Sequence, residues 1–142
     1  MPVSDNLAGA FYINSAIQVV SNTNVFQQCY LCNQGAIFSL IDTPIMTDTA
    51  SQYLNNAALN GGVFYTDYSP VTLTGVTISK SYAVNGGVFY SYDKSPLIIT
   101  GSTISSTVSQ GQGGIGYFEE NPAFNSLTDT FTVTIKSTSL TT

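Results

Sequence analysis

The sequence predicts an all-β protein in which short strands stack as a parallel solenoid, and three observations support this prediction. A Gly-aromatic motif recurs at intervals of 26, 27, 25 and 27 residues, marked by Gly9, Gly35, Gly62, Gly87 and Gly114. The segments between these marks alternate in polarity and are rich in Val, Ile, Thr, Tyr and Phe, which is typical of strands. One unit of about 26 residues leaves its strand edges unpaired, so it is stable only when stacked on its neighbours.

Each repeat is expected to hold three short strands. The first follows the glycine mark, because Gly adopts the positive φ that a tight turn requires. The second follows a proline, whose missing N–H breaks no ladder bond there: Pro44, Pro70, Pro96 and Pro122. The third strand contains an aromatic or β-branched residue, and a small polar residue follows three positions later. We expect this small polar side chain to form hydrogen bonds with buried backbone groups. We expect one domain over residues 1–142, with about five coils near 9–34, 35–61, 62–86, 87–113 and 114–142.

A Gly-Gly-aliphatic-aromatic stretch is coupled to tetrads of the Phe-x-x-Asn type, here Phe26-Gln27-Gln28-Cys29 and Tyr53-Leu54-Asn55-Asn56. Over residues 8 to roughly 120 this pattern resembles the right-handed parallel β-helix of pectin-lyase-like repeat proteins. Within that group it is most similar to the polymorphic outer-membrane-protein and adhesin type of repeat. The resemblance implies an extracellular or cell-surface location. It leaves function open, because the same coil carries polysaccharide lyases, hydrolases, adhesins and structural rods.

Composition excludes several classes of function. The chain has three Lys, no Arg and no His, and its formal net charge is -5. It therefore lacks the basic stripe that neutralises phosphates, and nucleic acid is excluded as a principal partner. The absence of His removes the usual general base and the commonest zinc ligand. No apolar run reaches the roughly 18 residues that a membrane-spanning helix needs, so no membrane span is predicted.

One predicted column of residues is rich in Tyr and consists of Tyr12, Phe38, Tyr65, Tyr90 and Tyr117. Its neighbour on the opposite face is rich in Phe and consists of Phe11, Ile37, Phe64, Phe89 and Gly116. Because side chains alternate along a strand, one column points inward and the other outward. We expect the Tyr column outward, since a buried phenol needs a hydrogen-bond partner. It either keeps an ordinary strand soluble or forms a binding strip for another subunit or for sugar rings.

Acidic residues recur after the first strand of the repeats, at Asp42, Asp67 and Asp93, followed by Glu119 and Glu120. Stacked carboxylates of this kind are candidate Ca²⁺ ligands, and no other cofactor is expected. Asp is also a default turn residue, because its side chain bonds nearby backbone N–H groups. Cys29 and Cys32 form a lone C-x-x-C, which is either a local disulfide or a pair of free thiols.

The leading interpretation is a non-enzymatic structural or surface protein. Its partner is expected to be itself, by end-to-end or lateral stacking into a filament or surface layer, because an uncapped solenoid has open strand edges. One alternative is a carbohydrate-binding or adhesin module that uses the Tyr strip on glycans. A second is a polysaccharide lyase or hydrolase, whose carboxylate pair would come from Asp67 with Asp42 or Asp93.

Overall fold

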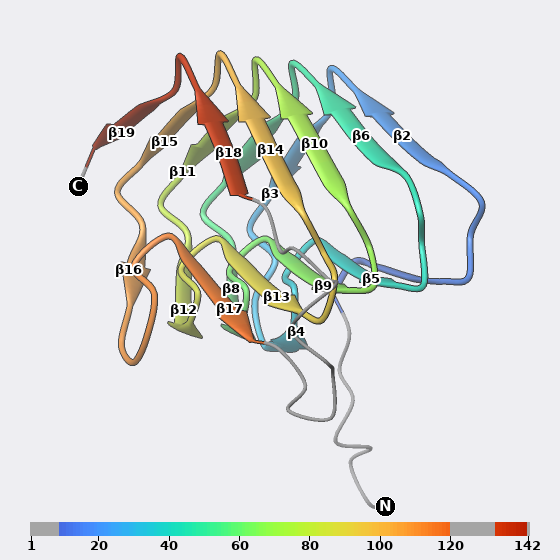
Figure 1. Ribbon diagram of the computed structural model, residues 1–142. Coiled ribbons are helices and arrows are strands. Elements are labelled where there is room, and N and C mark those ends of the chain that lie inside the picture. The colour runs from blue at the N-terminus through green and yellow to red at the C-terminus, as the bar shows by residue number, and fades with distance from the viewer. Residues whose placement is uncertain (1–8, 120–132, 142) are drawn as a thin grey trace, which may run out of the picture.

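The computed structural model describes residues 9–119 and 133–141, and every regular element in them is a β-strand. Successive strands follow one another around a common axis, so that each coil lies on the next (Figure 1). All pairings between strands are parallel, and the described chain makes about four turns. The predicted all-β parallel solenoid with a repeat of about 26 residues is confirmed.

Four sheets line the coil. The first sheet contains β1 (Phe11–Asn14), β5 (Phe38–Ile41), β9 (Phe64–Asp67), β13 (Phe89–Tyr92) and β17 (Gly116–Glu119). The second contains β2 (Val19–Asn22), β6 (Met46–Thr49), β10 (Val71–Thr74), β14 (Leu97–Thr100) and β18 (Val133–Lys136). The third contains β3 (Val25–Gln27), β7 (Gln52–Leu54), β11 (Thr77–Ser79), β15 (Thr103–Ser105) and β19 (Ser139–Thr141). The fourth contains β4 (Cys32–Gln34), β8 (Ala57–Asn60), β12 (Tyr82–Asn85) and β16 (Val108–Ser109).

The prediction of three strands in each coil was wrong, because the first four coils each contain a fourth strand, β4, β8, β12 or β16. Its segments carry small residues at the inward positions, such as Ala58 and Ala83, which are buried. Ala is depleted in strands, so composition alone gave these segments no strand signal.

Successive coils are direct neighbours at the glycine turns. A Cβ built on Gly62 would lie 2.2 Å from the carbonyl oxygen of Gly87. The first glycine of each turn has positive φ, at Gly35, Gly61, Gly86 and Gly113. Gly35 therefore corresponds to Gly61, one position away from the alignment used to mark the repeats.

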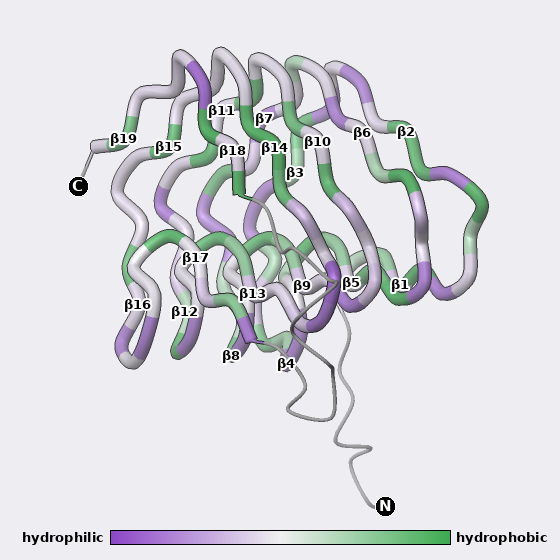
Figure 2. The backbone as a smooth tube through the Cα atoms, in the orientation of Figure 1, coloured by the Kyte–Doolittle hydropathy of each residue, from purple (hydrophilic) through white to green (hydrophobic). Residues whose placement is uncertain are grey.

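Apolar side chains fill the interior in columns, and the hydropathy of the chain repeats from coil to coil (Figure 2). Small polar side chains stand at the corners and accept N–H groups of the preceding coil. At the ends of the tetrads, Ser81 Oγ is buried with no hydrogen-bond partner among the described residues, contrary to expectation, whereas Asn56 Oδ1 accepts from Cys29 N at 3.1 Å as expected. Ser69 Oγ and Ser95 Oγ do the same at another corner, each at 3.0 Å. No helix in the described part of the chain is long and apolar enough to cross a bilayer.

Candidate functional site

The outward column of the first sheet holds most of the predicted Tyr strip. The register aligns Tyr12, Ser39, Tyr65, Tyr90 and Tyr117. Phe38 was wrongly placed in this strip, since it pairs with Phe11 and Phe64 and is buried in the core. The error arises because the sequence alignment matched Gly35 with Gly62, whereas the structure matches Gly35 with Gly61. Every residue that follows Gly35 in this strand was therefore assigned to the wrong face.

The three consecutive tyrosines stack on one another. The ring centroids of Tyr65 and Tyr90 are 5.5 Å apart with an interplanar angle of 14°. Those of Tyr90 and Tyr117 are 5.1 Å apart, with a tilt of 44°. The Tyr90 hydroxyl also donates to the Glu119 carboxylate. Much of each ring face is therefore in contact with another ring, and Tyr12, with Ser39 beside it, is the most exposed member of the strip.

The acidic residues lie beside this strip but do not form one straight row. Asp67 pairs with Ile41 and Tyr92, whereas Asp42 and Asp93 lie at the following turn position. Burial, and then the charges of Asp93 and Asp42, raise the pKa of the Asp67 carboxyl. Burial, and then Asp67, raises the pKa of Tyr65 to about 12. Among the described residues no group of three or more acidic, Cys or His side chains is placed to hold a metal ion. Glu120 and Pro122 lie outside the described residues.

We predict that Asp67→Asn raises the melting temperature at pH 7. A carboxyl whose pKa is raised in the folded state disfavours folding once it is ionised, and Asn removes this charge while keeping the shape. The gain should shrink as the pH falls through the pKa of the carboxyl, because the wild-type side chain then becomes neutral. Thermal unfolding between pH 7 and pH 3 measures the difference. An equal difference at both ends of this range would contradict the role of charge.

A buried polar cluster in the second coil was missed by the sequence analysis. Asp48 is 1% exposed and accepts hydrogen bonds from the Tyr53 hydroxyl and, at 2.6 Å, from Ser51 Oγ. Burial, and then the hydrogen bond to Asp48, raises the pKa of Tyr53. Asp48 occupies a column that continues with Leu73 and with Ile99. Aligning Pro44 with Pro70 in the sequence places Thr47 beside Leu73, so Asp48 was not recognised as a core residue.

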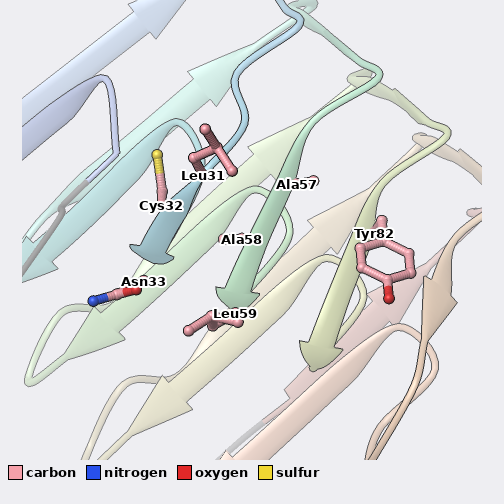
Figure 3. A pocket seen from close by; sticks show the side chains of 7 residues that line it. All are labelled: Leu31, Cys32, Asn33, Ala57, Ala58, Leu59 and Tyr82. Atoms are coloured by element: carbon pink, nitrogen blue, oxygen red, sulfur yellow. The ribbon is translucent and has the colours of Figure 1, made fainter.

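The outward face of the fourth sheet carries an apolar groove of about 500 Å³ (Figure 3). Leu31 and Cys32 line one side, next to Leu59 of β8 and Tyr82 of β12. Leu31 is 88% exposed, and none of the described residues that line the groove is charged. Cys29 and Cys32 are free thiols in the structure. Burial, and then Cys29, raises the pKa of the Cys32 thiol, so Cys32 is a weaker nucleophile than an ordinary cysteine.

Within the part of the chain that the structure describes, the first coil leaves its apolar interior partly uncovered. A hollow of about 230 Å³ opens at this end, with walls that include Phe11, Ile13, Val19 and Phe26. Ser21 and Asn24 also line the hollow, where Asn24 Nδ2 donates to Ser21 Oγ at 2.9 Å. The lining is thus mainly aromatic and aliphatic, with a small polar edge.

No protein-family model, no curated protein and no solved structure matches this chain. The structure shows a parallel β-solenoid. Membership of the pectin-lyase-like group, or of its adhesin-type repeats, remains an expectation from the sequence pattern.

Proposed function

We propose that the protein is a structural subunit that self-associates through its solenoid surfaces, in an extracellular or cell-surface setting. The proposal rests on the surface of the first coil, which is uncharged and exposes large apolar side chains. Residues 9–34 contain no charged side chain at all. Several of their large apolar side chains are exposed, including Val20 at 66% and Phe11 at 46%. Exposed apolar surface of this kind marks an interaction site.

The strand edges of the first coil support the same proposal. Within the described residues β1, β2, β3 and β4 each pair on one side only, with β5, β6, β7 and β8. Proteins usually protect such edges with charged residues or proline, because an open edge pairs with other chains. The described strands of the first coil contain neither. Its edges are therefore chemically suited to pairing.

Self-association is tested by sedimentation velocity and electron microscopy over a range of protein concentrations. We expect species larger than the 15.1 kDa chain that increase with concentration and persist at high salt, since residues 9–34 of the first coil carry no charge. Val20→Pro should suppress them. The N–H of Val19 bonds to Ile45 in the second coil, so the N–H of Val20 points to the open edge. Proline at this position removes an edge donor without breaking a bond inside the chain.

Val20→Ile is the matched control, because it keeps the N–H and an apolar β-branched side chain; it should assemble as the wild type does. A single 15.1 kDa species at every concentration would overturn the proposal. Glycan binding by the Tyr strip has less support. Sugar rings bind on aromatic faces, and in Tyr65 and Tyr90 these faces already contact neighbouring rings.

A further inference from the structure

We propose that copies of this chain join head to tail, with β17, β18 and β19 of one copy lying on β1, β2 and β3 of the next. Phe118 of the first copy would then occupy the hollow of about 230 Å³ at the first coil of the second. This inference rests on the proposed self-association and specifies the surfaces that perform it. The occupant of the hollow is thus a second copy of the same chain.

The aromatic column of the core is open at its first member. Phe11 stacks on Phe38 with ring centroids 5.3 Å apart and meets Phe26 edge-on at 6.0 Å. Farther along, Phe38 stacks on Phe64, and Phe64 stacks on Phe89. Every interior ring of this column has a ring on both sides, whereas within the described residues Phe11 has a stacked partner on one side alone. A further aromatic ring is the natural continuation of the column.

At the other end of the column, the aromatic ring comes from Phe118, two residues after the column position itself. The register places Gly116 next to Phe89, where the other coils carry Phe. A Cβ on Gly116 would lie 2.8 Å from the ring of Phe118, so this ring occupies the space beside the glycine. Phe118 is 37% exposed. The last described coil therefore carries a partly exposed aromatic ring beside the glycine of the aromatic column, and the exposed part of this ring is what a head-to-tail contact would cover.

The remaining columns also match. Continuing the register by one coil would bring Val133 next to Val19, and Leu140 next to Phe26. These are the same columns in which internal coils already bury apolar side chains on one another. No charged residue of the first coil would be desolvated, because it has none. The fourth sheet ends at β16, one strand earlier than the others, so the contact uses the other three sheets.

Disulfide trapping tests the register directly. Neighbouring residues on parallel strands have Cα atoms about 5 Å apart, which lies within the range that a disulfide accepts. Tyr12→Cys and Tyr117→Cys are prepared separately in a Cys29→Ser/Cys32→Ser background and mixed under mild oxidation. Both positions belong to the outward column of the first sheet. We expect a cross-linked dimer in at least tenfold excess over the mixture of Tyr12→Cys with Ser139→Cys, which lies in the third sheet.

Leu59→Cys in the same background reports lateral contacts, since Leu59 lies in the apolar groove of the fourth sheet. Assembly with efficient Leu59 cross-links and none between Tyr12→Cys and Tyr117→Cys would overturn the head-to-tail inference but leave self-association standing. A wild-type chain that stays monomeric would overturn both. As a second measurement, Phe118→Ala should weaken assembly at least tenfold while its unfolding curve stays cooperative. Unchanged assembly of a folded Phe118→Ala protein would contradict the role of this ring.

Discussion

Replacing Gly61 with Ala should destabilise the protein by about 2–5 kcal/mol or prevent folding. Gly61 has a φ of 71°, and a left-handed conformation costs an L-residue about 1–2 kcal/mol. A Cβ at this position would also lie 1.9 Å from the carbonyl oxygen of Phe64. The backbone of the turn must move to relieve this clash, and overpacking typically adds about 1–3 kcal/mol. Urea unfolding monitored by tyrosine fluorescence measures the loss.

Gly75→Ala is the matched control. Gly75 has a similar φ of 64°, but a Cβ there meets no atom within 4 Å. Only the conformational penalty then applies, so the expected loss is about 1 kcal/mol. Equal losses for the two variants would show that the close approach of the Phe64 carbonyl to Gly61 does not limit which residue the turn accepts.

The second large effect is expected at the buried Asp48 and Tyr53 pair. Tyr53→Phe removes one of the two hydroxyls that donate to the Asp48 carboxylate within the described residues, the other being that of Ser51. A buried group that loses its partner costs about 1–3 kcal/mol, and more when it is charged. We therefore expect Tyr53→Phe to lower the free energy of unfolding by about 2–3 kcal/mol. Denaturant titration at pH 7 measures this change.

A double-mutant cycle separates the pair from its surroundings. Asp48→Leu places an apolar side chain in a column that continues with Leu73 and Ile99. The double variant Asp48→Leu/Tyr53→Phe should be more stable than Tyr53→Phe alone, because no buried carboxylate remains unpaired. Additive losses in the double variant would mean that the hydrogen bond between the two side chains contributes nothing to stability.

Most of the fold could be predicted from the sequence repeat. Its spacing and the strand composition predicted the all-β class and parallel stacking, and the small polar end of the tetrad predicted the corner bond between Asn56 and Cys29. Strands of the fourth sheet escaped detection because Ala58 and Ala83 have low strand propensity. Both side chains are buried, and this burial is a property of the three-dimensional coil.

The errors at the candidate site come from single-residue shifts. An alignment on Gly35 moved Phe38 into the outward strip, since one residue of slip exchanges the two faces of a strand. The same uncertainty joined Asp67 to Asp42 and Asp93 in one row. Only the hydrogen-bond register resolves such offsets. The buried Asp48 required the same register, because a charged residue in a Thr-rich segment otherwise suggests an exposed position.

The corner bonds described above also give the molecule a direction. At five corners a backbone N–H of one coil donates to a side-chain oxygen of the following coil, as from Thr43 to Ser69 and from Val76 to Ser102. Two chains continue this pattern only when both point the same way. Any fibre built from them is consequently polar, with two chemically different ends. We expect these two ends to elongate at different rates.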